Sequence, residues 1–495
     1  MTSAIFETTN GLFQFESVKK EGLFACHLGA IPTVAVFRAD TVGQLMNSST
    51  GNSKKSSVKT TQTSKGDQFR FLRPWIGRGL IISEGEHWRR HRKLISPAFS
   101  PAILRSFLPS FNSNVEIMLS RVSNSKSKVF DLRFLVKDLA LDIVTETTLG
   151  KAVGAQQVAT NRAEYIEPLD EALTCFAHRL MNPLHHLDLL YRLSGEGRKN
   201  TRVIRKVHRY VKKIVEERKS GKGEFVDPQS TMSTTVKKRL PCFLDLLLKA
   251  TQERPTEITE RDILEEVNAL MFAGQDSTSV AMTMALALVA GDQRVQGLII
   301  KELAEEVFAE EADPVRCPIT GEHCRRMRYL EAVVKEALRL YTPAPNTAKK
   351  VVEKEGVMVG GHRIPQGTSV LILYSLMHRD PVVFPQPDRF IPERFLEPEN
   401  FSFLDSAFAH FPRPVPLGAF IPFSTGPRVC LGLRYALLEM KAVLAGVLRR
   451  YHLKAVTPRD SIRFGVAVVL TIRSPVMVRF EERKVENFFA NKKCS

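Results

Sequence analysis

Cys430 is the residue of this chain whose surroundings most strongly indicate chemistry. It follows a turn that contains glycine and precedes an apolar helical stripe over residues 433–448. A thiol at the amino terminus of a helix has a lowered pKa, because unpaired amides and the helix dipole favour the thiolate. Gly426 and Gly432 allow tight turns and close approach to a flat ligand, and Arg428 supplies a cation suited to a carboxylate. This loop therefore predicts a thiolate presented to a soft, bulky metal centre, with a buried structural thiol as the alternative.

A second candidate is the polar sequence AGQDST at Ala273–Thr278, which lies in an otherwise apolar helical pattern. The pattern runs from Glu260 to Ala290, about 46 Å at ~1.5 Å per residue. Thr259 and Asp262 form a start that resembles a capping box. Because the pattern is apolar on nearly every face, the helix is expected to cross the interior of the protein.

Polar side chains inside such a helix are unfavourable unless they are paired, so this motif needs a reason. It predicts a groove that holds a small ligand, where Asp276, Ser277 and Thr278 relay protons. A polar kink, or a cap between two shorter helices, is the alternative. A transmembrane span fits badly, because Gln275 and Asp276 would lie in the lipid.

A third motif is the pair Glu336 and Arg339, three residues apart in a helical pattern. Such pairs are common on helix surfaces and stabilise them only slightly. The neighbouring Val333 and Leu340 are apolar, which indicates that the pair is partly buried. A buried pair needs further partners to offset desolvation, and Arg394 in the sequence FIPERF is a candidate.

These motifs occur in an order typical of a known family. The sequence FSTGPRVCLG, with Phe423, Gly426, Arg428, Cys430 and Gly432 in place, resembles the haem-binding signature of cytochromes P450. The chain is similar to that family in four further motifs: WRRHR at Trp88–Arg92, AGQDST at Ala273–Thr278, EALR at Glu336–Arg339 and PERF at Pro392–Phe395. The resemblance covers about Phe13 to Glu482. It implies one domain over residues 1–495, mainly α with small β-sheets (α+β), with a haem between a long central helix and a cysteine-bearing loop.

The resemblance also implies a role for each matching residue. Cys430 is expected to bind the iron of haem b (iron protoporphyrin IX) as its proximal ligand, and its thiolate favours O–O cleavage. Residues expected to contact the haem or its propionates are Trp88, Arg92, Lys349, Phe423 and Arg428. Residues expected to line the distal oxygen site and deliver protons are Asp276, Ser277 and Thr278. Glu336, Arg339 and Arg394 are expected to form the buried network on the proximal side.

Three residues depart from the family's pattern. Many members carry Glu where Ala273 stands and link it covalently to the haem, so here the haem is expected to be non-covalent apart from the bond to Cys430. Lys349 stands where the family usually has Arg, which replaces a forked contact by a point charge. Ser277 stands where the family usually has Thr, and it keeps the hydroxyl.

The activity implied is insertion of one atom of dioxygen into a hydrophobic substrate: a lipid, a fatty acid, a hormone-like molecule or a xenobiotic. Electrons would come from NADPH through cytochrome P450 reductase, with cytochrome b5 as a further candidate partner. The stretch GEHWRRHRKLISPAFS resembles the eukaryotic branch that includes fatty-acid ω-hydroxylases. The sequence does not identify the substrate, because pocket residues come from distant segments. A haem enzyme that rearranges peroxides, and a haem sensor, remain rival classes.

Composition adds expectations about surroundings. Lys and Arg outnumber Asp and Glu by 71 to 53, a formal charge of +18, which favours acidic partners or anionic lipid, with solvated surface charge as the alternative. Residues 48–66 predict a flexible insert, and residues 219–241 a second one. The first lacks the interleaved aromatic residues of a nucleic-acid-binding arm, so no nucleic-acid partner is expected. Strands are expected over Gly29–Phe37 and, as two strands, over Ser461–Phe480.

The seven cysteines, odd in number and scattered, predict reduced thiols facing the cytosol. Residues 1–25 contain no apolar run that could anchor the chain, yet the resemblance implies the cytosolic face of the endoplasmic reticulum. Asn200–Arg218 forms a basic amphipathic pattern, which is typical of a helix on a membrane or on the protein's own core. A zinc site at Cys317, His323 and Cys324 is a minor alternative, because its spacing matches no standard site.

Overall fold

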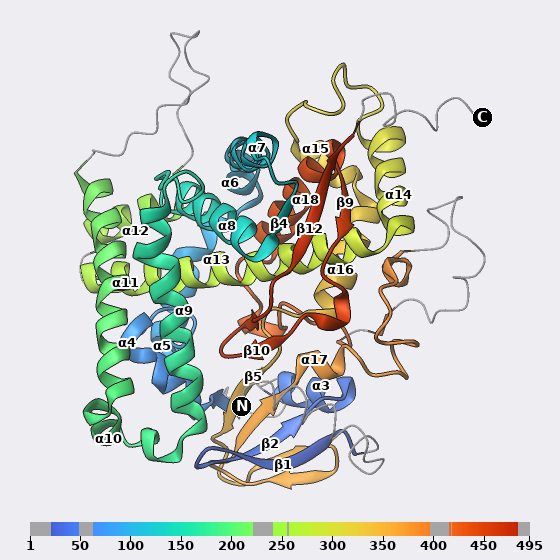
Figure 1. Ribbon diagram of the computed structural model, residues 1–495. Helices are drawn as coiled ribbons and strands as arrows, with labels where there is room; N and C mark the ends of the chain where they lie inside the picture. Colours follow the sequence, from blue (N-terminus) through green and yellow to red (C-terminus); the bar gives the residue numbers. More distant parts are fainter. Residues whose placement is uncertain are drawn as a thin grey trace.

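One long helix, α13 (Glu260–Gly291), runs through the middle of the molecule in the computed structural model (Figure 1). The structure describes residues 21–48, 63–220, 241–254, 257–396, 415–416 and 418–483. Thr259 and Asp262 form the predicted capping box, in which each side chain accepts the other residue's backbone amide. The helix continues through Ala273–Thr278 without a break, so the alternative of two shorter helices is wrong.

Helices make up most of the rest of the described chain. The longer ones are α5 (Gly85–Ile95), α7 (Leu108–Asn124), α8 (Leu132–Thr148), α9 (Ala159–Met181), α11 (Gly195–Lys219), α12 (Phe243–Glu253), α14 (Gln293–Glu302), α16 (Arg328–Leu340) and α18 (Leu433–Arg450). The shorter ones are α3 (Ala39–Ser48), α4 (Arg73–Ile76), α6 (Pro101–Ser106), α10 (Asp188–Leu193), α15 (Gly321–Arg326) and α17 (Tyr374–Met377). Single turns are η1 (Asp67–Leu72), η2 (Ser96–Phe99), η3 (Pro183–His186), η4 (Leu303–Val307), η5 (Pro392–Phe395), η8 (Gly426–Arg428) and η9 (Arg459–Ser461).

The strands form small sheets beside the helices (Figure 1). The largest has the order β1 (Leu23–Leu28), β2 (Ile31–Val36), β8 (Ser369–Ile372), β5 (Thr347–Val351) and β3 (Thr63–Lys65). A second contains β4 (Val129–Asp131), β12 (Met477–Glu482) and β9 (Tyr451–Ala455), and the two hairpins are β6 (Val357–Val359) with β7 (His362–Ile364) and β10 (Phe464–Val466) with β11 (Leu470–Ile472). The expected mainly α fold with small sheets is confirmed.

Two apolar clusters meet along α13. Residues 263–272 belong to a cluster shared with α9, α11 and α12, and residues 280–290 belong to one shared with α7, α16 and α18. The polar motif at Ala273–Thr278 falls between them. Burial of apolar area on both sides therefore holds the motif at the junction of the two clusters, where a cavity opens.

Some sequence predictions needed correction. The expected strand at Gly29–Phe37 is confirmed as β2, but Ser461–Phe480 contains three strands rather than two. The insert expected over residues 48–66 is wrong at its end, because Thr63–Lys65 forms β3, paired antiparallel with β5. Residues 49–62, and residues 221–240 of the second insert, lie outside the described residues.

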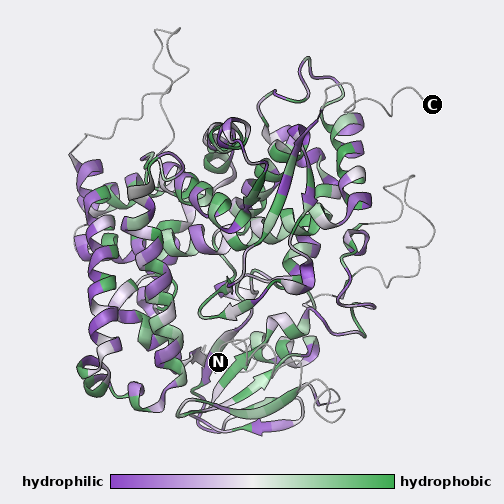
Figure 2. Cartoon of the chain, in the orientation of Figure 1, coloured by the Kyte–Doolittle hydropathy of each residue, from purple (hydrophilic) through white to green (hydrophobic). Residues whose placement is uncertain are grey.

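The basic helix is a surface helix of the core rather than a membrane-lying one. Its apolar residues, among them Val203, Val207 and Val211, are buried in the cluster shared with α9 and α13, while its Lys and Arg residues face outward. Figure 2 shows α11 as mostly hydrophilic along its outward side. No described helix is long and apolar enough to cross a membrane.

A fully buried ion network joins α16 to the segment around η5. Arg339 donates to both carboxylate oxygens of Glu336, at 2.7 and 2.8 Å, and both side chains have no exposed area. The Arg339 guanidinium also donates to the carbonyls of His378, Pro387 and Arg389. Glu336 accepts the amide of Ile391 and lies 3.4 Å from Arg394. The predicted three-residue network is therefore present, with backbone groups as the partners that offset desolvation.

Glu336→Ala should destabilise the protein by about 3–5 kcal/mol, because it leaves the buried Arg339 charge without its carboxylate. The measurement is the thermal midpoint of the haem-loaded protein, together with the yield of folded protein. Glu322→Ala is a matched control, since Glu322 pairs with Arg325 at the same spacing on an exposed surface and should contribute less than about 1 kcal/mol. Equal midpoints for the two variants would contradict the assigned role of the network.

Candidate active site

The cysteine-bearing loop forms one wall of a cavity of about 950 Å³. The loop is closed by a hydrogen bond from the Cys430 amide to the Phe423 carbonyl, at 2.9 Å. Gly426 begins the turn η8 with a φ of +73°, in the left-handed region that glycine tolerates without strain. The Cys430 thiol is open to this cavity, and Phe423 lines it as well. The loop thus presents sulfur to the interior space, as the sequence predicts.

The environment of this thiol differs from the expectation in one respect. Burial raises the pKa of Cys430 above its ordinary value, and the amides of Gly432 and Leu433 together with Arg92 offset only part of that effect. The helix terminus therefore contributes in the expected direction, but desolvation outweighs it, so the predicted lowering is wrong for the thiol alone. A metal ion bound to sulfur would displace the proton.

Positive charge is concentrated around the same cavity. Among the described residues that line it, five are basic and two are acidic; these are Lys65, Arg89, Arg92, Lys349, Arg428, Glu84 and Glu266. Burial, with the charges of Arg428 and Lys349, lowers the pKa of Lys65 to about 7. Burial and Arg428 lower the pKa of Lys349 to about 8. A flat group that carries two carboxylates would relieve this repulsion. Haem is such a group, because it carries two propionates.

The residues predicted to contact that group converge from four elements. Trp88 and Arg92 are four residues apart on α5, so they lie on one face of the helix and both line the cavity. The Arg428 guanidinium lies 4.0 Å from the centre of the Trp88 ring and donates to the Ser83 carbonyl at 2.8 Å. Lys349 lines the cavity from β5. With Cys430, these residues give a donor set that fits a haem.

Lys65 is a residue of this site that the sequence did not reveal. It lies in β3, directly opposite Lys349 in the antiparallel register, and lines the cavity beside it. Its segment is rich in Ser, Thr and Lys and predicts a solvated loop. A strand of three residues has too short a pattern to be recognised, so the pairing with β5 alone determines its place.

The predicted groove in α13 is present, with two hydroxyls beside the cavity. Ala273, Gly274, Ser277 and Thr278 line it, and Ala273 is open to it. The hydroxyls of Ser277 and Thr278 donate to the carbonyls of Ala273 and Gly274, each at 2.6 Å. A Cβ on Gly274 would lie 2.7 Å from Val144, so glycine is needed for the close packing of α8. Position 273 is alanine, so it has no side-chain carboxylate that could bond to a haem.

Asp276 does not line the cavity, and the prediction that it does is wrong. Its carboxylate lies on the other side of α13, 3.6 Å from Nζ of Lys137, because one residue along a helix turns the side chain by about 100°. Lys137 also pairs with Asp170, which is half exposed. Burial raises the pKa of Asp276 to about 6, with Asp170 raising it and Lys137 lowering it.

Glu439, on α18, is a second residue that the sequence analysis missed. It is completely buried, and its carboxyl lies near the Thr278 hydroxyl. Burial raises the pKa of Glu439 well above its ordinary value, and Thr278 offsets this only in part. Burial therefore disfavours the charged form of this carboxyl. Glu439 stands nine residues after Cys430 in the sequence, but this spacing alone does not indicate a place in the site. Only the packing of α18 on α13 brings Glu439 there.

The minor alternative of a zinc site in the 317–324 loop is not supported. The Cys317 sulfur accepts from Arg449 at 3.3 Å, and His323 pairs with Glu311 at 2.9 Å. Burial raises the pKa of Cys324 to about 11, which disfavours a thiolate ligand. These three side chains do not form a metal-ligand group within the described part of the chain.

Comparison with known proteins agrees with this geometry. A family model described as "Cytochrome P450" matches residues 4–480. The chain is 32% identical over 459 residues to "Cytochrome P450 4V2" of Mus musculus, covering 92% of this chain and 81% of that protein. It is 31% identical over 474 residues to "Cytochrome P450 4V2" of Homo sapiens, covering 95% and 84%. It is 32% identical over 465 residues to "Cytochrome P450 4c3" of Drosophila melanogaster, covering 92% and 81%.

Cys430→Ala should abolish the red-shifted Soret band that the reduced protein gives with carbon monoxide, because that band requires a thiolate bound to the iron. The measurement is the difference spectrum of the reduced protein with and without carbon monoxide. Cys324→Ala, which removes a buried thiol remote from the cavity, should keep the full band. A band of normal intensity in Cys430→Ala would overturn the assignment of the ligand.

Proposed function

The chain belongs to the cytochrome P450 family of haem-thiolate monooxygenases, and from that premise we propose that it inserts one oxygen atom into a lipid-like organic substrate. The electrons would come from NADPH through a flavoprotein reductase. The observation that carries the proposal is the convergence of Cys430, the cationic group and the hydroxyl groove on one cavity. Haem b, held by Cys430, supplies the oxygen-activating chemistry when it is bound.

The remaining lining of the cavity supports an apolar substrate. It includes six large apolar side chains from several parts of the chain, two of them on α9: Phe69, Leu80, Phe176, Leu180, Phe243 and Val468. Such a surface binds alkyl chains by excluding water and offers few groups to orient a polar molecule. Together with the similarity to the branch that includes fatty-acid ω-hydroxylases, this favours a fatty acid or related lipid.

Proton delivery is proposed to run along α13. Asp170 is half exposed, Lys137 pairs with both Asp170 and Asp276, and Asp276 lies one residue from Ser277 in the groove. In this route Asp276 gives up its proton toward the groove and is then protonated again through its ion pair with Lys137. The Ser277 hydroxyl holds the receiving water in position. A rotation of the Asp276 side chain away from Lys137 is required. A haem enzyme that rearranges peroxides would need no such relay.

The redox partner is proposed to be an acidic flavoprotein, cytochrome P450 reductase, with cytochrome b5 as a second donor. Helix α5 carries Trp88, Arg89 and Arg92 toward the cavity and exposes Arg90 and Lys93 on its other faces. Positive charge on an element that also touches the haem site suits an acidic partner, because complementary charge steers association. The formal charge of +18 has the same sign.

Association with the cytosolic face of the endoplasmic reticulum is proposed through leucines near α10 rather than through the basic helix. Five leucines of this segment are between 43% and 69% exposed: Leu184, Leu187, Leu189, Leu190 and Leu193. Figure 2 shows this corner of the molecule as hydrophobic, next to the hydrophilic outer side of α11. Exposed apolar side chains beside basic ones are typical of a surface that inserts into a lipid interface.

The substrate proposal predicts that the purified haem protein, with reductase and NADPH, converts medium- or long-chain fatty acids into hydroxylated products. The measurement is product identity by mass spectrometry, with oxygen isotope from labelled dioxygen in the product. Protein without reductase, and the Cys430→Ala variant, are the controls and should form none. Product only from added peroxides, with NADPH unused, would favour the rearranging class instead.

The relay predicts different failures at its two ends. Ser277→Ala should still consume NADPH but divert much of it to hydrogen peroxide, because the hydroxyl positions the proton rather than supplying it. Asp276→Asn should slow NADPH consumption by about 100-fold. In the parent protein the rate should fall as pH rises through about 6, where Asp276 loses its proton, and this step should vanish in Asp276→Asn.

Two comparisons control the relay experiment. Ser277→Thr should keep its coupling, since the hydroxyl is retained, and Thr278→Ala should change coupling less, since that hydroxyl is buried beside Glu439. The measured quantity is product formed per NADPH oxidised. Unchanged coupling in both Ser277→Ala and Thr278→Ala would exclude these hydroxyls from the mechanism.

The membrane proposal predicts that Leu189→Ser with Leu193→Ser weakens binding to phospholipid vesicles by about tenfold or more, because each leucine loses apolar area buried in lipid. The measurement is co-sedimentation at low and at high salt. Val382→Ser removes an equally exposed apolar side chain elsewhere and should bind as the parent does. Binding that high salt abolishes and the leucine changes do not affect would contradict insertion and favour charge alone.

A further inference from the structure

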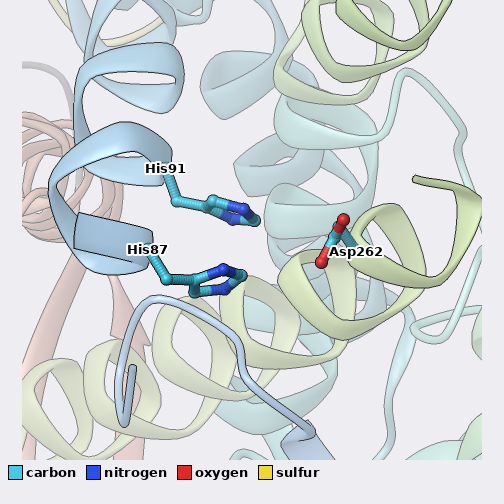
Figure 3. A group of neighbouring side chains, drawn as sticks. All are labelled: His87, His91 and Asp262. Carbon is cyan, nitrogen blue, oxygen red and sulfur yellow. The ribbon is translucent and has the colours of Figure 1, made fainter. Parts of the chain in front are cut away.

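A group of metal-ligating side chains lies outside the cavity, between α5 and the start of α13. His87 and His91 are four residues apart on α5, and Asp262 is in the first turn of α13. One potential ligand atom of each residue lies within 4.8 Å of those of the other two. Figure 3 shows both imidazoles extending from α5 toward the Asp262 carboxylate. It is the one such group found within the described residues.

The outer hydrogen bonds of the two imidazoles leave one nitrogen of each ring for a ligand. Nδ1 of His91 donates to Oε1 of Glu266 at 2.8 Å, because a carboxylate can only accept. Nε2 of His91 is therefore left with a lone pair, and it is buried without a hydrogen-bond partner in a side chain that is 1% exposed. Nε2 of His87 donates to the Arg78 carbonyl at 3.2 Å, which leaves Nδ1 with its lone pair. Metal-bound histidines are anchored in this way by an acceptor on the outer nitrogen.

Asp262 is arranged to supply the negative charge. Oδ2 of Asp262 accepts hydrogen bonds from the amide and the hydroxyl of Thr259, at 2.8 and 2.7 Å, and Oδ1 is left for another ligand.

We propose that His87, His91 and Asp262 form a binding site for a divalent transition-metal ion of the zinc type, with water as the fourth ligand. Two imidazoles and a carboxylate are ligands that zinc accepts in tetrahedral geometry. Zinc–ligand bonds of about 2.0–2.1 Å require ligand atoms about 3.3–3.5 Å apart. Small side-chain rotations bring atoms that now lie within 4.8 Å to that separation. Hard ions such as magnesium are disfavoured, because they prefer oxygen ligands.

The site would clamp α5 against α13. Helix α5 carries Trp88 and Arg92 to the cavity, and α13 carries the hydroxyl groove, so a metal ion between them would fix the two walls of the cavity relative to each other. The Glu266 carboxylate ties His91 to α13 already, and it also accepts the Leu80 amide. Metal binding to the folded state alone would stabilise that state by mass action. This inference does not depend on the proposed substrate.

The test uses the haem-loaded protein without a polyhistidine tag, stripped with a chelator and dialysed against micromolar zinc. Metal analysis should find one zinc ion per chain, and the thermal midpoint should rise when zinc is restored. X-ray absorption at the zinc edge should report nitrogen and oxygen ligands without sulfur, which distinguishes this site from cysteine thiols. A sulfur-containing coordination shell, or no retained zinc, would overturn the proposal.

Variants then locate the ion. His87→Gln and Asp262→Asn should each weaken zinc binding at least tenfold and remove the thermal shift, and Asp262→Asn keeps the shape of the side chain. His91 is left intact, because its buried bond to Glu266 also supports the fold. His362→Gln removes an exposed imidazole in β7 and should bind zinc as the parent does. Unchanged zinc affinity in the double variant of His87 and Asp262 would place the ion elsewhere and refute the site.

Discussion

Buried positive charge is the constraint that organises the active site. Among the described residues, five basic side chains and only two carboxylates line a largely apolar cavity, and burial, with the neighbouring positive charges, lowers the pKa of Lys65 to about 7 and of Lys349 to about 8. A protein cannot hold such a group at low energy unless an anion enters with it. A haem would meet that need with its propionates, and Cys430 is the residue that would hold its iron.

The central helix α13 carries both the hydroxyl of Ser277 and the carboxylate of Asp276. Apolar clusters on either side of Ala273–Thr278 keep it straight and buried, and the helical rotation between neighbouring residues divides their tasks. Ser277 is turned toward the cavity, whereas Asp276 is turned toward Lys137 and, through it, toward solvent. One helix thus separates the Asp276 carboxylate from the Ser277 hydroxyl in the groove by about 100° of rotation. The separation explains why a buried polar motif is tolerated in an otherwise apolar helix.

Two polar assemblies hold the walls of the cavity in place. On one side, Arg339 joins Glu336 to three backbone carbonyls, which fixes the segment that leads toward the cysteine loop. On the other, Glu266 binds both His91 and the Leu80 amide, which fixes α5 on α13. Each uses a fully buried carboxylate whose hydrogen bonds are satisfied by several partners. Neither would stabilise the protein if one partner were missing.

The sequence by itself determined the features that depend on neighbouring residues along the chain. The cysteine loop, the length and capping of α13, and the spacing of Glu336 and Arg339 all follow from local pattern, so they were predicted at the right residues. The resemblance of the motifs to one family then gave the cofactor and the fold. Helical periodicity fixes angles within an element, which is why Ser277 and Thr278 were found at the cavity.

Only the tertiary structure decided what depends on the neighbours of each element in space. It turned Asp276 to Lys137 and brought Lys65 beside Lys349. It also buried the apolar face of α11 against α9 and left the leucines near α10 exposed. It also reversed the expected direction of the Cys430 pKa, because desolvation depends on everything that surrounds the thiol. The local pattern shows which faces of a helix or strand are apolar or polar, but not which other elements cover those faces. The burial and the charge of each side chain depend on that covering.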